Sequence, residues 1–232
     1  MRRMLTTATP YSVVLVDLDG TIVDSARGIT ATLAYTLRRM GLPVPPPSRL
    51  LEFVGPPIMD GFRDLAGLDP EQSLTALELY RERYATHGAF DATVYPGMPE
   101  ALQALRAAGL PLALATSKPE TQAARILEHF GLLDLFTVVA GASDDERRSE
   151  KADVIAWAQG LLDDAGVDRS SPIMVGDRIH DVHGAAVHGI GTVFAEWGYG
   201  SPAEASGAVS VVRRPRDLPR VVLRGEGTST AA

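Results

Sequence analysis

Two aspartates stand two positions apart at the end of an apolar run. Asp17 and Asp19 follow residues 13–16, Val-Val-Leu-Val, which are enough for a buried strand. In an extended chain their side chains point to the same face, and two carboxylates held close together repel each other unless a positive charge neutralises them. Gly20 comes next and allows a sharp turn with close approach of a ligand to the backbone. The segment is either a polar turn after a core strand or an acidic site for a cation.

Further polar residues follow other apolar runs of the chain. Thr116 and Ser117 come directly after one such run, and Asp177 comes after another. Asp181 lies four positions beyond Asp177, which is one helical turn if a helix begins there. Several carboxylates at one edge of a sheet repel one another and call for a divalent cation. Oxygen ligands in a chain without cysteine favour Mg²⁺.

The basic residues are unevenly divided between the two types. Of the 22 basic residues, 20 are arginine, and Lys118 and Lys151 are the two lysines. Codon composition explains the excess of arginine, and a lysine that remains is a candidate for a site that needs a compact ammonium. A divalent cation beside a lysine and hydroxyl donors would bind a dianionic phosphate. We expect Lys151 to belong to the site and Lys118 to lie beside it, so that Lys118→Arg would be the milder change.

Composition excludes several classes of protein. The absence of cysteine removes disulfides, thiol catalysis and cysteine-bound zinc, and the net charge of −7 argues against nucleic acid as a partner. No apolar run approaches the length of a membrane span, and the N-terminus has no secretory pattern. No Gly-x-x-x-x-Gly-Lys-Ser/Thr loop is present, which argues against a Walker-type nucleotide hydrolase. We therefore expect a cytoplasmic protein without membrane contact.

From residue 95 onwards, predicted strands and helices alternate. Apolar runs predict strands at 112–115, 137–140, 173–175, 192–195 and 209–212. Helical patterns fall at 98–108, 120–130, 151–163 and 181–188. Such alternation with short loops is typical of an α/β fold with a doubly wound, mostly parallel, Rossmann-like core sheet. Ligands bind such sheets at the edge where the carboxyl ends of the strands meet.

The segment at 27–91 has a different pattern. It contains helical patterns and turns without a convincing strand, and the first helix is expected to be capped by Asp24-Ser25. We therefore predict an inserted small α-helical domain at 27–91, with a core made of 11–26 and 92–223. The termini, 1–10 and 225–232, are expected to be flexible.

The ordered set of motifs resembles that of the haloacid-dehalogenase-like superfamily. The matching segments are Asp17-Leu-Asp-Gly-Thr, Thr116, Lys151 and Gly176-Asp177-Arg-Ile-His-Asp181, in the family's order. The helical insert resembles the family's small cap. A narrower likeness to phosphoglycolate-phosphatase-like enzymes rests on Asp24-Ser25, Gly55-Pro56-Pro57 and Thr116-Ser117-Lys118-Pro119.

The resemblance implies a role for each motif residue. Asp17 would be the nucleophile that forms an aspartyl-phosphate. Asp19 would protonate the leaving alcohol and then accept a proton from water, or would act only electrostatically. The phosphoryl oxygens would be held by Thr116, Ser117 and Lys151. Magnesium would be bound by Asp17, the backbone carbonyl of Asp19 and Asp177, with Asp181 orienting the ligands.

These roles predict a phosphoric monoester hydrolase that depends on Mg²⁺. Its partner would be a small phosphorylated metabolite, with phosphoglycolate as the first candidate. The alternatives are a 5'-nucleotidase, a phosphatase of a biosynthetic intermediate of secondary metabolism, and a β-phosphoglucomutase-like phosphomutase. A dehalogenase is disfavoured because it would need neither Asp19 nor a metal, and a binding module is disfavoured because the motif residues are intact. Nothing in the insert identifies the leaving group, and the oligomeric state is open.

Other conspicuous residues have simpler explanations. We expect His180, His183 and His188 to be solvated or satisfied helix positions rather than a zinc site. Tyr80, Tyr84 and Phe90 are expected in the core of the insert. Arg178 either bonds locally or reaches toward substrate.

Overall fold

A six-stranded parallel sheet forms the base of the molecule. The computed structural model describes residues 9–225, so the predicted flexible termini lie almost entirely outside the described residues. The central strand β1 (Val13–Val16) is fully buried and has β4 (Leu112–Pro119) on one side and β6 (Pro172–Gly176) on the other. The outer strands are β5 (Val138–Ala142), β7 (Gly191–Ala195) and β8 (Ser210–Val212), which complete the order β5-β4-β1-β6-β7-β8.

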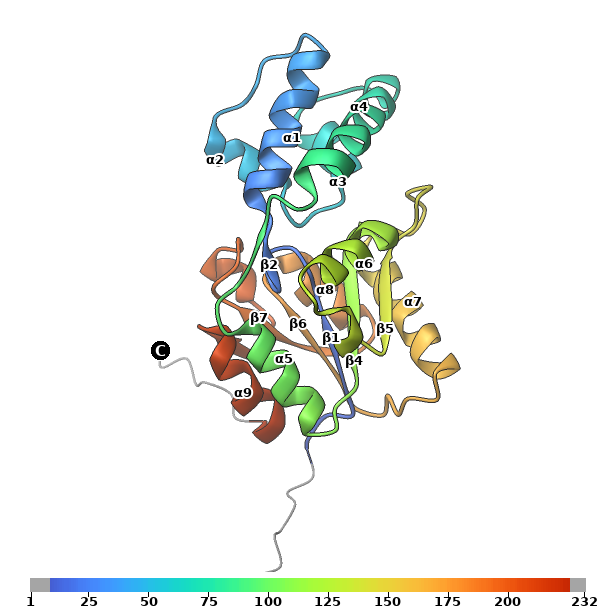
Figure 1. Ribbon diagram of the computed structural model, residues 1–232, viewed down its shortest axis with the longest axis vertical. Helices are drawn as coiled ribbons and strands as arrows, with labels where there is room; N and C mark the ends of the chain where they lie inside the picture. Colours follow the sequence, from blue (N-terminus) through green and yellow to red (C-terminus); the bar gives the residue numbers. More distant parts are fainter. Residues whose placement is uncertain (1–8, 226–232) are drawn as a thin grey trace, which may run out of the picture.

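Alternation along β1 sends its side chains into two cores. Val14 and Val16 face one layer of helices, whereas Val13 and Leu15 face the other. The first layer consists of α5 (Met98–Ala107), α6 (Glu120–His129) and α9 (Leu218–Arg224). The second consists of α7 (Lys151–Asp164) and α8 (Ile179–Val187) (Figure 1). Both faces are covered, which is why the strands are almost entirely apolar. The predicted doubly wound α/β fold is confirmed.

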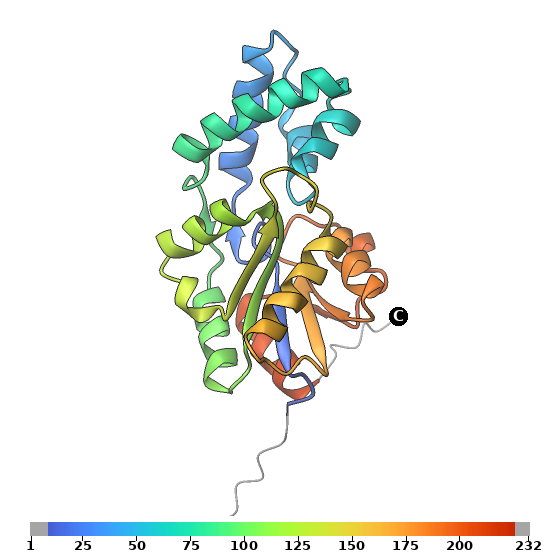
Figure 2. The same ribbon diagram turned by 90° about the vertical axis from the view of Figure 1, so that its right-hand side faces the viewer.

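A helical insert, residues 26–88, stands over the carboxyl ends of the strands (Figure 2). Its elements are α1 (Ala26–Arg39), α2 (Pro47–Leu50), η1 (Leu51–Phe53), α3 (Ile58–Asp60), η2 (Gly61–Leu65), α4 (Pro70–Arg83) and η3 (Tyr84–Gly88). It contains helices and turns without a strand, and it has a hydrophobic core of its own around Leu33, Phe53 and Phe62. The sequence pattern did not predict α3 and η2.

The chain leaves and re-enters the sheet domain through a two-stranded ribbon. The strands β2 (Val23–Asp24) and β3 (Thr93–Val94) pair antiparallel, with Val23 opposite Val94. The helical insert is therefore joined to the core by two segments that lie side by side (Figure 1).

The start of α1 differs from its prediction. The side chain of Ser25, at the N-cap, makes no capping hydrogen bond, and its buried hydroxyl has no partner among residues 9–225. Instead, the hydroxyl of Tyr199, from the loop after β7, accepts hydrogen bonds from the backbone N–H groups of Ser25 (2.7 Å) and Ala26 (2.9 Å). It donates to Asp24 at 2.8 Å. Asp24 Oδ1 also accepts from the N–H of Ala26 at 3.3 Å, so the core supplies the shorter of the contacts at this helix start.

Two further findings complete the fold. The strand β4 continues past the predicted 112–115 to Pro119, so Thr116, Ser117 and Lys118 belong to an extended strand. Among the described residues, no helix is both long and apolar enough to cross a membrane.

Candidate active site

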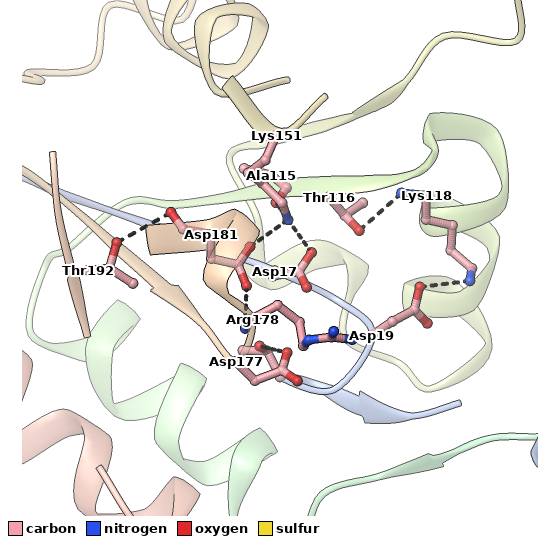
Figure 3. A network of polar contacts seen from close by, with 11 residues as sticks. Asp17, Asp19, Ala115, Thr116, Lys118, Lys151, Asp177, Arg178, Asp181 and Thr192 are labelled. Carbon is pink, nitrogen blue, oxygen red and sulfur yellow. Dashed lines mark hydrogen bonds and ion pairs between the residues drawn. The ribbon is translucent and has the colours of Figure 1, made fainter. Parts of the chain in front are cut away.

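The first motif residue, Asp17, is buried where β1 ends. The register places Val16 opposite Leu114 of β4 and Val175 of β6, so Asp17 lies between the ends of both neighbouring strands. Lys151, the first residue of α7, donates a hydrogen bond from Nζ to Oδ1 of Asp17 at 2.7 Å and to the carbonyl of Ala115 at 3.0 Å (Figure 3). The same ammonium lies 2.8 Å from Oδ1 of Asp181, an ion pair by distance. Lys151, the predicted third motif, therefore contacts Asp17 of the first motif and Asp181 of the fourth.

Burial strongly affects the charges of this cluster. Burial raises the pKa of Asp17 to about 6, with Lys151 opposing the shift and Asp181 adding to it. Burial also raises the pKa of Asp177, and the carboxylates of Asp181 and Asp17 raise it further. Burial alone would lower the pKa of Lys151, but the two neighbouring aspartates raise it above its usual range. The cluster holds more negative charge than a single ammonium can neutralise, which is the condition that favours binding of a cation.

Asp177 is held by backbone and hydroxyl donors. It accepts hydrogen bonds from Thr21 Oγ1 at 3.0 Å and from the backbone N–H of Tyr199 at 2.7 Å. Gly20 has a left-handed φ of 87°, and a Cβ there would stand 2.3 Å from Oδ2 of Asp177. A Cβ at Gly198 would come equally close to Asp177. Glycine is thus required at both positions to admit the carboxylate.

Three buried carboxylates form a group that could hold a metal ion. One oxygen each of Asp17, Asp177 and Asp181 lies within 4.8 Å of the others. Asp181 was expected to orient the ligands rather than to bind. Its Oδ2 accepts from the backbone N–H of Arg178 at 3.0 Å and its Oδ1 faces Lys151, so both oxygens already have a neighbour. The side chain of Asp19 lies outside this group.

Asp19 pairs with Lys118, a residue that the sequence analysis placed beside the site. The Lys118 ammonium donates to Oδ2 of Asp19 at 2.8 Å, and both side chains are buried (Figure 3). The ammonium also lies 4.6 Å from the ring centroid of Tyr84. Burial lowers the pKa of Lys118, but Asp19 raises it above its usual range. The scarcity of lysine marked Lys118 as a candidate, but nothing in the sequence indicated that it reaches Asp19.

Three polar atoms of residues that line the cavity are buried without a hydrogen-bond partner in the described part of the chain. They are Oδ1 of Asp19, Oγ of Ser117 and the hydroxyl of Tyr84. Thr116 accepts a hydrogen bond from the backbone N–H of Lys118 at 3.3 Å. The side chains of Asp19, Thr116 and Ser117 line one cavity together with Asp17 and Lys118. Unpaired buried polar atoms are costly unless a ligand satisfies them.

The helical insert supplies the apolar wall of the same cavity. This wall is formed by Ile29, Phe53, Ile58, Leu77, Tyr80 and Tyr84. Tyr80 and Tyr84 stack at 5.4 Å between ring centroids and are buried in the insert core, as expected, while also facing the cavity. Phe90 departs from expectation: it is 39% exposed and stacks on His129 of α6.

A family model described as haloacid dehalogenase-like hydrolase matches residues 14–195. The chain belongs to the haloacid dehalogenase-like hydrolase family. The predicted family is therefore confirmed, and so is the predicted enzyme class, a phosphoric monoester hydrolase.

Several relatives of this haloacid dehalogenase-like hydrolase are similar over most of its length. It is 43% identical to "Tyrosine-protein kinase PtkA" of Mycobacterium tuberculosis over 86% of this chain and 67% of the relative. It is 36% identical to a "5'-nucleotidase" of Pseudomonas aeruginosa, over 85% and 88% of the two chains. It is 34% identical to a "Phosphoglycolate phosphatase" of Rhodospirillum rubrum, over 85% of both chains. A solved structure, a predicted phosphatase from Clostridium acetobutylicum, superposes with a TM-score of 0.86 at 36% identity over 92% of this chain and 98% of that one.

In this haloacid dehalogenase-like hydrolase, Arg178 and His188, near the fourth motif, form hydrogen bonds with distant segments of the fold. Arg178 donates from Nε to Glu204 at 2.9 Å and from Nη1 to the carbonyl of Val54 in the helical insert, so it bonds locally and across to the insert. His183 is exposed and His188 contacts the carbonyl of Ala152 at 2.8 Å. Among the described residues, no histidine joins the group of candidate metal ligands.

Proposed function

We propose that the protein is a Mg²⁺-dependent phosphatase that hydrolyses a small phosphate monoester through an aspartyl-phosphate on Asp17. The observation that carries the proposal is the pairing of Asp17 with Lys151 and of Asp19 with Lys118, with both aspartates lining one cavity. One carboxylate is placed to attack and the other to exchange a proton. Residues 27–91 serve as the cap that closes this cavity.

The donor set fits a magnesium ion. Asp17 and Asp177 offer carboxylate oxygens, the donors that Mg²⁺ prefers, with the backbone carbonyl of Asp19 as a further ligand. The close approach of Gly20 to Asp177 supports this assignment, because a Cβ would displace the carboxylate. Asp181, already facing Lys151 and the Arg178 backbone, orients the ligands. When bound, the ion supplies positive charge that offsets the repelling carboxylates and polarises the phosphoryl group.

In the first step, an oxygen of Asp17 attacks phosphorus in line with the leaving alcohol. The new O–P bond forms while the bond from phosphorus to the alcohol oxygen breaks. The departing oxygen takes a proton from Asp19, whose Oδ1 has no other partner among the described residues. Lys118, on the other oxygen of Asp19, holds the carboxyl group in place.

In the second step, water attacks the phosphorus of the aspartyl-phosphate. Asp19, now ionised, accepts a proton from this water, and the bond between phosphorus and the Asp17 oxygen breaks to release phosphate. The phosphoryl oxygens are held by the hydroxyls of Thr116 and Ser117 and by the ammonium of Lys151. The unpartnered Oγ of Ser117 supports this assignment, because a phosphoryl oxygen would satisfy it.

Two leaving groups have support from relatives. One is glycolate, as the name of the Rhodospirillum rubrum relative indicates, and the other is a nucleoside, as the name of the Pseudomonas aeruginosa relative indicates. A second function, transfer of the phosphoryl group from Asp17 to a hydroxyl acceptor other than water, is favoured by the 43% identity to a protein named as a tyrosine kinase. A phosphomutase would belong to this second class.

The test is a phosphate-release screen across phosphorylated metabolites, run with Mg²⁺ and with a chelator. We expect release that requires Mg²⁺, disappears in Asp17→Asn and persists in Asp134→Asn, an exposed aspartate outside the site. Mass spectrometry of the quenched enzyme should show one phosphoryl group on Asp17. Turnover by Asp17→Asn at the wild-type rate would exclude the covalent mechanism. Loss of the phosphoryl group to an added alcohol rather than to water would favour the transferase.

A further inference from the structure

The cavity contains no cation that lacks a carboxylate partner within the described part of the chain. Two basic side chains line it, Lys118 and Arg81. Lys118 is paired with Asp19, and Arg81 is paired with Glu146. A further acid, Asp144, lines the cavity and has no ion-pair partner among the described residues. The outer part of the cavity, away from the paired Asp17 and Lys151, therefore carries a net negative charge.

The Arg81–Glu146 pair joins the two halves of the protein across the cavity. Arg81 belongs to α4 of the helical insert, and Glu146 belongs to the loop between β5 and α7, which rises from the sheet toward the insert (Figure 2). Both side chains line the cavity, and the carboxylate side chain is 18% exposed. Burial raises the pKa of Glu146, and Arg81 opposes this shift. Both side chains thus belong to the lining of the cavity in which an ester would bind.

The backbone around Glu146 is fixed in an unusual conformation. Among the described residues, Glu146 is the one non-glycine residue with a positive φ, 61°. Such a conformation is unfavourable for a residue with a Cβ and persists where surrounding contacts impose it. Here the loop is closed by a hydrogen bond from the Ser143 N–H to the Arg148 carbonyl at 2.9 Å, and the Glu146 N–H donates to the Ser143 carbonyl at 3.1 Å. The loop therefore holds the Glu146 carboxylate against Arg81.

A charged leaving group would be poorly matched to these surroundings. The wall supplied by the insert is apolar, and burying an anion there is costly without a free cation. Glu146 already neutralises the charge of Arg81, so an incoming carboxylate that shared this guanidinium would join Glu146 and Asp144 as a third acid around one cation. An uncharged alcohol would neither bury a charge against the apolar wall nor compete with Glu146 for Arg81.

We propose that the Arg81–Glu146 pair makes the enzyme selective for phosphate monoesters whose leaving alcohol is uncharged. Esters that carry a second anionic group on the alcohol, such as phosphoglycolate, are disfavoured. Glu146 is the discriminating residue, because it neutralises the single insert cation that lines the cavity in the described part of the chain. This inference rests on the proposed phosphatase function.

The test compares two esters of nearly equal size, phosphoglycolate and 2-hydroxyethyl phosphate, which differ in a carboxylate. We expect wild-type kcat/KM to favour 2-hydroxyethyl phosphate. In Glu146→Gln, Arg81 becomes an unpaired cation, and kcat/KM for phosphoglycolate should rise on the order of tenfold while that for the uncharged ester changes little. Glu146→Gly removes the same carboxylate and relieves the strained backbone. It should therefore shift the ratio of kcat/KM for phosphoglycolate to kcat/KM for 2-hydroxyethyl phosphate in the same direction. The double variant Arg81→Gln/Glu146→Gln should return the ratio toward wild type.

The matched control is Glu52→Gln, which removes the carboxylate of an exposed pair with Arg49 in the insert, outside the cavity. It should leave the ratio unchanged. A wild-type preference for phosphoglycolate, or an unchanged ratio in both Glu146 variants, would overturn the inference and leave the phosphatase proposal intact. Failure of the wild type to hydrolyse either ester or 4-nitrophenyl phosphate would overturn both.

Discussion

The ammonium of Lys118 lies 2.8 Å from Oδ2 of Asp19, and both groups are buried beneath the helical insert. The other lysine of the chain, Lys151, stands in the same relationship to Asp17 at 2.7 Å. Each aspartate of the first motif thus has a lysine of its own, in a chain where arginine supplies every other basic residue. The ammonium groups of these two lysines supply positive charge to the site.

We expect Lys118→Arg and Lys151→Arg to be damaging to a similar degree. The earlier expectation of a milder effect at Lys118 assumed a position beside the site, whereas Lys118 contacts Asp19 directly. A planar guanidinium needs more room than an ammonium, and a displacement of about 1 Å can cost on the order of 10²-fold in rate. Measurement of kcat/KM for both variants on one ester checks this, with melting temperatures as a control for folding. Wild-type activity in Lys118→Arg would show that the site does not require an ammonium at position 118.

Asp19→Ala should slow turnover by roughly 10²–10⁴-fold through loss of proton transfer. Esters with good leaving groups, such as 4-nitrophenyl phosphate, should lose less because they leave without a proton. The same change strands the buried Lys118 charge, so the melting temperature should fall as well. Asp19→Asn also lacks the proton and the charge but fills the same space, so it controls for the cavity that alanine leaves. An equal loss on good and poor leaving groups, with dephosphorylation shown not to be limiting, would argue for a purely electrostatic role.

Stabilisation by Mg²⁺ should depend on pH. The pKa of Asp17 is about 6 in the folded protein and 3.8 in an exposed side chain. Since the folded value is the higher one, the stability contributed by this proton is present below about pH 4 and is lost as the pH rises through 6. Under the proposed function, Mg²⁺ would bind the ionised form and should offset this loss.

We therefore compare the two pH values at one fixed Mg²⁺ concentration, 100 times the Kd at pH 7.5. The melting temperature should rise by about 5–10 °C at pH 7.5 and by less at pH 5. Thermal melts with and without the ion at each pH test this, because exposed carboxylates contribute equally to both curves. The shift should shrink in Asp17→Asn and remain in Asp134→Asn. Equal shifts at both pH values would contradict the assignment.

Tyr199→Phe should loosen the start of α1. The hydroxyl that it removes caps the backbone N–H groups of Ser25 and Ala26, and loss of a helix cap costs about 1 kcal/mol, or roughly 2–4 °C in melting temperature. Amide hydrogen exchange at these two positions should accelerate. Tyr35→Phe, whose hydroxyl accepts from Arg39 on the surface, is the matched control. Unchanged exchange in Tyr199→Phe would show that the cap is dispensable.

The strands and the motif residues were predictable because each rests on a local pattern. Apolar runs identified the six strands of the sheet within a few residues, and the polar residues that follow them meet where parallel strands end. The group of candidate metal ligands could be anticipated in part. Asp17 and Asp177 were expected as ligands, and Asp181 joins their group because α8 begins at Ile179 and turns its side chain back toward Lys151.

Contacts between distant segments escaped prediction. The bond from Arg178 to the Val54 carbonyl spans 124 positions, and the bond from the Ser25 N–H to the Tyr199 hydroxyl spans 174. Neither has a periodicity or a spacing that a sequence pattern could reveal. The π-helical turn η2 was missed because its few apolar positions do not repeat at the usual helical interval.

The ribbon of β2 and β3 makes the helical insert separable from the sheet in evolutionary terms. Because Val23 lies opposite Val94, the chain departs and returns at points one strand spacing apart, about 5 Å. Any unit whose ends lie that close could be exchanged at this junction without moving a single strand of the sheet. The sheet domain would transfer the phosphoryl group, and the helical insert would select the alcohol. The two can therefore change in sequence independently within one gene.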